Sequence, residues 1–231
     1  MKIGVIGALE PEIKVLLSEM GHPEVQKHGI VEYYTGHIAD AEIMLVRSGV
    51  GKVAAAIATT ILIQNFAPDY VVNTGSAGGL DTTLNVGDIV FADEVYHHDV
   101  DVTQFGFELG QVYQMPATYS CAPELITAAE TAARSLSCRS VRGQIATGDA
   151  FMGTDESVAK LRELFPQTTA VEMEGAAIGQ TCYSLNTPFI IIRSLSDIAG
   201  KESHETFLTY LEKAGKQSAQ LVMGMITQLM H

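Results

Sequence analysis

The sequence contains little cysteine, and the cysteines it has are far apart. Cys121, Cys138 and Cys182 are the three in a chain of 231 residues, and no C-x-x-C pair occurs. A disulfide scaffold or a zinc ribbon needs thiols in pairs at closer spacing. We therefore expect free thiols and a reducing, cytoplasmic setting.

Positive charge is scarce as well. Lys and Arg number 14 against 27 Asp and Glu, which gives a net charge of −13. An acidic surface repels phosphate backbones and anionic lipids, so neither a nucleic acid nor a membrane is expected as a partner. The longest apolar-leaning run, residues 53–63, is too short to cross a bilayer. Acidic residues soon after residue 9 also argue against a signal peptide.

Strand-like and helix-like segments alternate along most of the chain. Strands are predicted at residues 1–9, 30–38, 41–48, 69–74, 88–98, 141–147, 168–171 and 187–196, and helices at 10–20, 52–65, 123–136, 155–164, 175–184 and 205–230. No linker or internal repeat interrupts them. The pattern predicts one α/β domain over residues 1–231, with a central mixed, mostly parallel sheet flanked by helices on both faces. Residues 99–116 are irregular but carry aromatics, which favours a pocket wall or an interface.

Two carboxylates, Glu172 and Glu174, stand where a predicted strand gives way to a predicted helix. In an extended segment these side chains point to the same side, so one pocket could hold both. Acidic residues are also favoured at helix N-termini by the helix dipole alone. The pair by itself leaves both explanations open.

Further candidate residues follow other predicted strands. They are Glu12, the glycine-rich loop of residues 75–79, Glu174 and Asp197, with Phe151 in another such loop. Carboxyl ends of parallel strands meet at one edge of a sheet, where α/β proteins bind ligands. With Arg193 inside a predicted strand, the pattern predicts a pocket of three carboxylates, one arginine and an aromatic plate.

A dinucleotide-binding fingerprint, Gly49-x-Gly51-x-x-Ala54, lies between a predicted strand and a helix. A true site needs an acidic residue at the end of the next strand, where it can reach a ribose. Asp69 has the spacing but begins its strand. An NAD-dependent oxidoreductase is therefore a weak alternative.

A metal site is a second alternative, because His97, Asp99 and Asp101 share one face of an extended segment. These residue types can ligate a metal, but no second cluster in the sequence completes the set.

Several motifs together resemble the 5′-methylthioadenosine/S-adenosylhomocysteine nucleosidases of the purine nucleoside phosphorylase superfamily. The similarity runs from end to end and rests on residues 1–12, 48–56, 73–79, 148–151, 171–174 and 193–197. It implies a nucleoside phosphorylase-like fold and a homodimer that needs no cofactor and no metal. It also implies hydrolysis of the N-glycosidic bond of 5′-thio-substituted adenosines.

The resemblance assigns roles to individual residues. Glu12 would activate the attacking water and Asp197 would donate a proton to adenine N7. The implied substrate-binding set is Ser76 and Arg193 at the water, Glu174 and the Met173 backbone at the ribose, Phe151, the Met152 backbone and Gly78 at adenine, and Leu9, Val50 and Phe207 along the remaining walls. The neighbouring subunit would add a wall of Val102, Phe105 and Tyr113. Leu9, Val50, Met152, Tyr113 and Gly175 depart from the residues common in the family.

Phosphorolysis is the closest alternative reaction, with phosphate in place of water. Binding phosphate needs cations, and arginine is the usual partner. Superfamily phosphorylases carry an arginine where Asn73 stands here, and no arginine precedes Arg47. Water is therefore the expected nucleophile.

Overall fold

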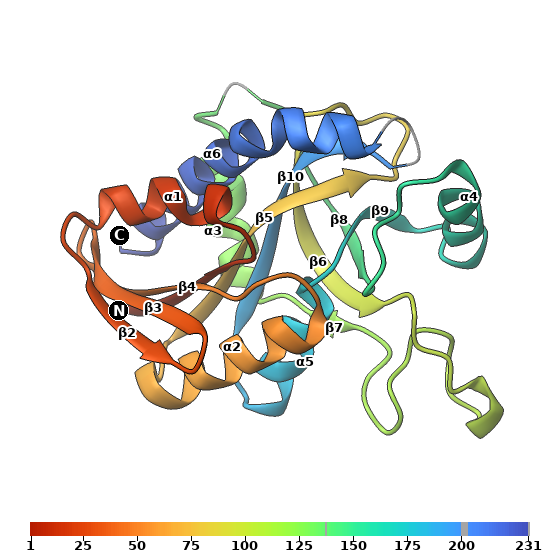
Figure 1. Cartoon of the computed structure of the whole chain (residues 1–231), viewed down its shortest axis with the longest axis horizontal. Coiled ribbons are helices and arrows are strands. Elements are labelled where there is room, and N and C mark those ends of the chain that lie inside the picture. Colours follow the sequence, from red (N-terminus) through yellow and green to blue (C-terminus); the bar gives the residue numbers. More distant parts are fainter. Residues whose placement is uncertain (137, 200–202, 231) are drawn as a thin grey trace.

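The described chain forms a ten-stranded sheet with helices on both sides (Figure 1). This computed structural model describes residues 1–136, 138–199 and 203–230, without the side chains of residues 203–208. The strands are β1 (Lys2–Gly7), β2 (Glu24–His28), β3 (Val31–Ile38), β4 (Ala41–Arg47), β5 (Tyr70–Gly79), β6 (Ile89–His97), β7 (Tyr119–Ser120), β8 (Ser140–Thr147), β9 (Thr168–Glu172) and β10 (Phe189–Ile198). The α-helices are α1 (Glu10–Glu19), α2 (Lys52–Phe66), α3 (Pro123–Ala133), α4 (Asp155–Leu164), α5 (Gly175–Ser184) and α6 (Ser203–Leu229).

The sheet consists of two parallel groups that run in opposite directions. Strands β4, β1, β5 and β10 form one group, and β6, β8 and β9 form the other. The groups meet through antiparallel pairs, β5 with β9 and β10 with β6. Because β10 pairs with both β5 and β6, the strands β10, β6, β8, β9 and β5 close into a barrel.

The expectation of a mostly parallel sheet is therefore wrong, although the mixed α/β class is confirmed. Among the described residues five strand pairings are parallel and five are antiparallel. The sequence pattern could not reveal this, because a buried antiparallel strand in a closed barrel is as apolar as a buried parallel one.

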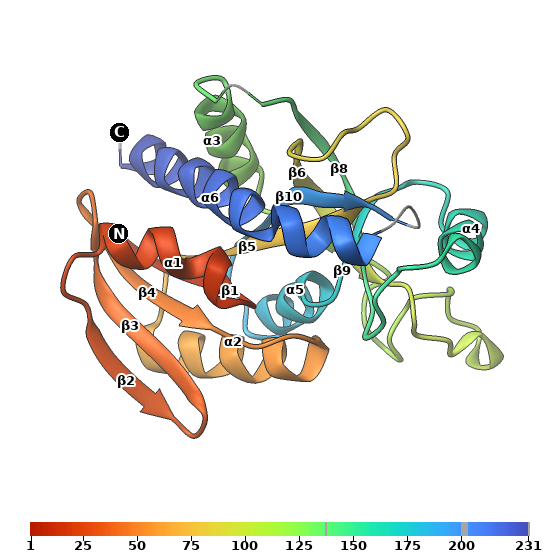
Figure 2. The same cartoon turned by 45° about the horizontal axis from the view of Figure 1, so that its top comes forward.

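Helices cover the two faces of the sheet unequally. Helix α6 packs on β10 between α1 and α3, while α2 and α5 pack together on the opposite side (Figures 1 and 2). The buried strands supply the apolar surface for both layers: Phe189, Ile190, Ile191 and Ile192 of β10 are at most 4% exposed.

The glycine-rich segment 75–79, predicted as a loop, is the second half of β5. It pairs with β10 over its full length and with β9 at Gly78 and Gly79. Its glycines permit close approach of side chains rather than a turn. A Cβ at position 75 would collide with Arg193 Nη1 and would lie 2.9 Å from Glu12 Oε1. This strand therefore passes directly beneath two polar side chains.

Two short strands were absent from the sequence prediction. Strand β2 is exposed at every position, so it lacks the alternation that identifies a strand, and β7 has two residues. Between β6 and β7, residues 98–118 contain only one turn of 3₁₀ helix, Thr103–Phe105, which confirms the predicted irregular segment. This segment projects from the body of the molecule (Figure 1).

Candidate active site

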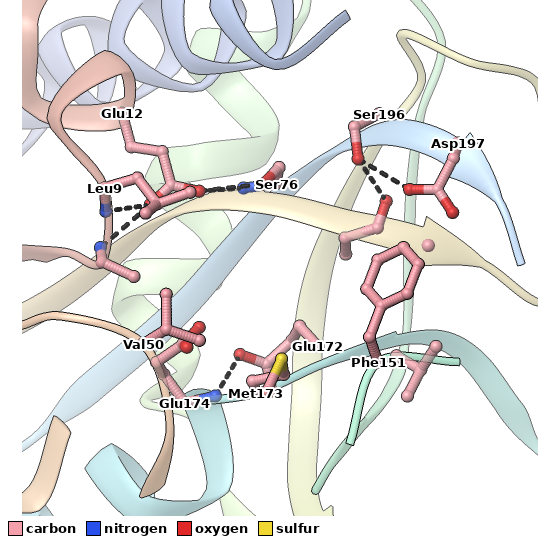
Figure 3. A pocket seen from close by; sticks show the side chains of 14 residues that line it. Leu9, Glu12, Val50, Ser76, Phe151, Glu172, Met173, Glu174, Ser196 and Asp197 are labelled. Atoms are coloured by element: carbon pink, nitrogen blue, oxygen red, sulfur yellow. Dashed lines mark hydrogen bonds between the residues drawn. The ribbon is translucent and has the colours of Figure 1, made fainter. Parts of the chain in front are cut away.

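A pocket lies where the ends of several strands meet (Figure 3). The space between its walls, including space open to solvent, amounts to about 470 Å³. The lining residues come from six chain segments and are Ala8, Leu9, Glu12, Val50, Ser76, Ala77, Gly78, Phe151, Val171, Glu172, Met173, Glu174, Ser196 and Asp197. Four carboxylates and no Lys or Arg stand among these residues.

Glu12 is held by four hydrogen-bond donors at one end of the pocket. It lies in the first turn of α1, which begins directly after β1, and its side chain reaches back to the N–H groups of Ala8 and Leu9 (2.9 and 3.0 Å to Oε2). Ser76 donates to Oε1 from both N–H (2.9 Å) and Oγ (2.8 Å). Backbone N–H groups can only donate, so this geometry suits an ionised, acceptor-only carboxylate.

Arg193 is completely enclosed behind the pocket and does not line it. Its Nη2 donates to Asn73 Oδ1 (2.7 Å), to Glu172 and to Glu174 (3.4 Å), and its side chain is 1% exposed. Burying a cation is favourable only when it is paired, and here two carboxylates are within reach. Asn73 Nδ2 in turn donates to Ile6 O (2.8 Å), which fixes the amide that accepts from the arginine.

Glu172 anchors the turn that carries Met173 and Glu174. Its Oε2 accepts the N–H groups of Glu174 (2.9 Å) and Gly175 (2.8 Å), and its Oε1 accepts the hydroxyl of Thr147. Because β9 pairs antiparallel with the end of β5, the chain returns to the level of Ser76 at this turn. That return brings Glu172 and Glu174 next to Arg193.

Glu174 lies in the pocket wall, and its Oε1 accepts the N–H of Gly51 (3.0 Å) just before α2. Burial raises the pKa of Glu174 to about 7, and the charge of Glu172 adds to the shift; Arg193 and the Gly51 hydrogen bond oppose it. One arginine thus faces two neighbouring carboxylates, and the surplus negative charge favours a proton on Glu174.

Asp197 and Phe151 lie at the other end of the pocket from Glu12 (Figure 3). Asp197 is 2% exposed, and Ser196 Oγ donates to its Oδ1 (2.8 Å). A Cβ at position 78 would lie 3.2 Å from Asp197 Oδ2, so Gly78 leaves this oxygen room to meet a ligand. Phe151, 47% exposed, faces the same end from the loop after β8. An acid and an aromatic ring thus flank one end of the site.

The structure brings together most of the predicted site residues. Those that line the pocket are Glu12, Ser76, Gly78, Phe151, Met173, Glu174, Leu9, Val50 and Asp197, and Met152 lines an adjoining recess beside Gly78 and Asp197. The side chain of Phe207 lies outside the described residues. Val102, Phe105 and Tyr113 do not line this pocket; Phe105 is 72% exposed and packs edge-on against Tyr113 in the projecting segment.

Comparisons with known proteins agree with this geometry. The model of the phosphorylase superfamily matches residues 2–227. A 5′-methylthioadenosine/S-adenosylhomocysteine nucleosidase from Pseudoalteromonas translucida is 53% identical, over 99% of this chain and 98% of that protein. A crystal structure of such a nucleosidase from Colwellia psychrerythraea, in complex with adenine, has a TM-score of 0.97 at 52% identity and covers 99% of this chain and 96% of its own. The chain belongs to the 5′-methylthioadenosine/S-adenosylhomocysteine nucleosidase family.

A solved structure of different name shares the nucleosidase fold. The futalosine hydrolase of Helicobacter pylori has a TM-score of 0.93 at 31% identity and covers 98% of this chain and 97% of its own. The same architecture therefore serves hydrolases of more than one nucleoside. The fold alone does not decide the substrate of a family member; the residues of the pocket decide it.

The dinucleotide hypothesis is wrong for this nucleosidase-family chain. The first N–H groups of α2, which would have to bind a pyrophosphate, are bonded to the chain's own carboxylates. Gly51 N–H donates to Glu174, and Lys52 N–H donates to Asp149 Oδ1 (2.7 Å). The Gly49 to Ala54 motif thus serves the nucleosidase pocket by holding Glu174.

The proposed metal ligands have separate partners. His97 Nε2 meets Gln180 Oε1 (2.9 Å), Asp99 binds Lys52, and Asp101 Oδ1 accepts from Thr103. Within residues 1–136, 138–199 and 203–230, no three His, Cys, Asp or Glu side chains gather as metal ligands. The same part of the chain has no helix that is long and apolar enough to cross a membrane.

Sequence reasoning assigned no role to Ser196 or Asn73. The one feature of the sequence that could have indicated a role for Ser196 is its position next to Asp197 on the same strand. In the sequence Asn73 stands out only because superfamily phosphorylases carry an arginine at this position, yet it is one of the acceptors that hold Arg193. That function follows from a contact between β5 and β10, which neither strand's sequence reveals.

The raised pKa of Glu174 predicts a pH-dependent difference between wild type and Glu174→Gln. Between about pH 4.5 and pH 7 the folded state holds a proton that the unfolded state releases, so the wild type loses stability as pH rises through this window. The loss amounts to about 3 kcal/mol. Gln cannot ionise, so from about pH 5 to about pH 8 the variant should gain stability relative to wild type. Urea unfolding at both pH values measures this; a constant difference would contradict it.

Proposed function

We propose that this protein hydrolyses the N-glycosidic bond of 5′-methylthioadenosine and of S-adenosylhomocysteine, releasing adenine and the 5′-thioribose product. Named nucleosidases at about half sequence identity over the full chain support this activity. So does the Neisseria meningitidis nucleosidase in complex with methylthio-immucillin-A, which has a TM-score of 0.96 at 45% identity and covers 97% of this chain and 98% of its own. We further propose that residues 1–231 form a single nucleosidase domain.

In this mechanism the two ends of the pocket act on opposite sides of the sugar. The C1′–N9 bond breaks toward an oxocarbenium-like ribose, and its electron pair goes to adenine. Asp197 transfers a proton to adenine N7, which turns the base into a better leaving group. Glu12 removes a proton from the water whose oxygen bonds to C1′. Glu174 forms hydrogen bonds with the ribose hydroxyls.

Water is the nucleophile in this proposal because the pocket repels phosphate. The observation that carries this choice is the lining itself, in which Glu12, Glu172, Glu174 and Asp197 stand without any Lys or Arg. A phosphate dianion needs cationic partners. Arg193 is enclosed at 1% exposure, and its Nη2 donates to Asn73, Glu172 and Glu174. Asn73 stands where a phosphorylase would carry its arginine.

Adenine release from 5′-methylthioadenosine should therefore proceed at full rate in phosphate-free buffer. The product sugar should be the free thioribose rather than its 1-phosphate, and added phosphate should leave the initial rate unchanged. Ultraviolet detection of adenine with mass analysis of the sugar tests this. A rate that requires phosphate, or a sugar 1-phosphate product, would identify a phosphorylase instead.

We also propose a homodimer in which Val102, Phe105 and Tyr113 complete the neighbouring subunit's pocket. Support comes from their position on the projecting segment, away from the pocket of their own chain, with Phe105 72% exposed. Val53 and Ile57 of α2 add exposed apolar surface (70% and 50%). Light scattering should report a dimer, and Phe105→Ala should raise KM for 5′-methylthioadenosine with little change in thermal midpoint. A monomer of full activity would refute this arrangement.

A cytoplasmic location is proposed on the strength of the thiols. Cys121, Cys138 and Cys182 are all free in the structure, and Cys121 and Cys182 are buried. Burial raises the pKa of the Cys121 thiol to about 12, which keeps it protonated and unreactive. Such cysteines need no oxidising compartment.

A further inference from the structure

Three residues outside the pocket are joined by a closed ring of hydrogen bonds through their side chains and backbone N–H groups. Lys52 Nζ donates to Asp99 Oδ1 (2.6 Å), Asp149 N–H donates to Asp99 Oδ2 (2.9 Å), and Lys52 N–H donates to Asp149 Oδ1 (2.7 Å). We call Lys52, Asp99 and Asp149 the brace. Its members come from α2, from the segment after β6 and from the loop after β8, so the brace ties together three distant parts of the chain.

The brace touches two elements that the pocket uses. Gly51, next to Lys52, donates its N–H to Glu174 on the ribose side. Asp149 stands two residues before Phe151 in the loop of residues 148–153, which supplies the aromatic wall beside Asp197. Two consecutive N–H groups at the start of α2 therefore bind one carboxylate from the ribose wall and one from the purine wall. The relative position of the two walls depends on this helix end.

Close packing around the loop of residues 148–153 restricts the position of Asp149. A Cβ at position 51 would lie 3.1 Å from Asp149 Oδ1, and Gly51 has φ +97°, so the glycine both turns the chain and makes room for Asp149. On the other side of the loop, a Cβ at position 148 would collide with the His98 ring. The loop is thus fixed at its first two residues, Gly148 and Asp149, and Phe151 follows after one further residue.

Lys52 provides the positive charge that keeps the two acids of the brace together. Its side chain is 19% exposed and that of Asp99 is 28% exposed, so their ion pair is shielded from much of the solvent. Although burial raises the pKa of Asp99, the hydrogen bonds from Lys52 and from Asp149 N–H hold it below its ordinary value. Without the cation, Asp99 would face Asp149 with no compensating charge and would turn toward solvent. Asp149 N–H would then lose its acceptor.

We propose that Lys52 and Asp99 are positioning residues that hold the purine-binding loop of residues 148–153 in place through Asp149. This inference rests on the proposed function, since it deepens the role of that loop in binding adenine. Neither residue lines the pocket or touches the reacting atoms. Their loss should weaken binding of the base without removing the acid or the nucleophile.

The experiment measures adenine affinity by calorimetry together with kcat and KM for 5′-methylthioadenosine. Lys52→Met removes the charge, Asp99→Asn places an amide donor in the ring, and Lys52→Arg restores a cation. Arg142→Met is the matched control, because Arg142 pairs with Asp93 at the same 2.6 Å and belongs to β8, the strand that leads into the same loop. Thermal midpoint and light scattering on each variant report on folding and assembly.

Lys52→Met and Asp99→Asn should each raise the adenine Kd and KM by about 10-fold, equivalent to about 1.4 kcal/mol, and leave kcat within about 3-fold, as expected when uniform binding is lost. Lys52→Arg should regain most of the affinity, and Arg142→Met should match wild type. Unchanged adenine Kd in both brace variants, or an equal loss in Arg142→Met, would overturn the proposal. Calorimetry needs no turnover, so failure of the proposed function would appear separately, as a wild type that releases no adenine.

Discussion

An Asp197→Asn variant should lose about 10²–10⁴-fold in kcat, the usual contribution of a positioned general acid. That loss corresponds to about 3–5 kcal/mol of transition-state stabilisation. Asparagine keeps the shape of the side chain and can still accept the hydroxyl of Ser196, so the fold should persist. What it lacks is an acidic proton for adenine N7. Single-turnover assays of adenine release measure the loss in the chemical step.

A substrate with an activated leaving group separates this acid role from a general loss of function. The leaving group of a 4-nitrophenyl riboside, 4-nitrophenolate, departs without protonation. Asp197→Asn should therefore cleave this substrate nearly as fast as wild type does. Asp88→Asn is the matched control, because Asp88 is also buried (8% exposed) but accepts from Asn85 N–H away from the pocket. Equal losses on both substrates would contradict the acid role.

The sequence predicts that Glu12, Glu174 and Asp197 share a pocket, because each is expected to follow a strand of a mostly parallel sheet. All three residues line one pocket, but the reason holds only for Glu12, which follows β1 of the parallel group. Asp197 lies within β10, after a bulge between Leu195 and Asp197, and Glu174 follows a strand antiparallel to β5.

Contacts between distant strands were beyond the reach of the sequence. The strand that contains Arg193 and the burial of this residue both follow from the apolar residues around it, and the structure agrees with both predictions. The partners of Arg193 do not, because Asn73 and Glu172 reach it only through the pairing of β5 with β10 and of β9 with β5. Likewise the glycines at 75, 78 and 79 suggested a loop, while their role is to let side chains approach a strand.

Replacing Glu12 by glutamine should lower kcat by about 10²–10⁴-fold, because glutamine cannot take a proton from water. It should also destabilise the protein. Both oxygens of Glu12 accept from donors: Ala8 and Leu9 N–H on one side, Ser76 N–H and Oγ on the other. A glutamine NH₂ must face one of these pairs. It is best tolerated beside Ser76, whose hydroxyl can rotate to accept, but Ser76 N–H then loses its acceptor at a cost of about 1–3 kcal/mol.

Activity and stability losses in Glu12→Gln can be separated because they respond to different changes. Assays well below the thermal midpoint isolate the chemical step, and Glu10→Gln in the same helical turn, with a side chain 76% exposed, should match wild type in both respects. Unlike Asp197→Asn, Glu12→Gln should remain slow on the 4-nitrophenyl riboside, because an activated leaving group does nothing for the water. Recovery of Glu12→Gln on that substrate would mean that Glu12 assists departure of the base rather than attack. The two carboxylates at opposite ends of the pocket are therefore distinguished by which half of the reaction each variant can still perform.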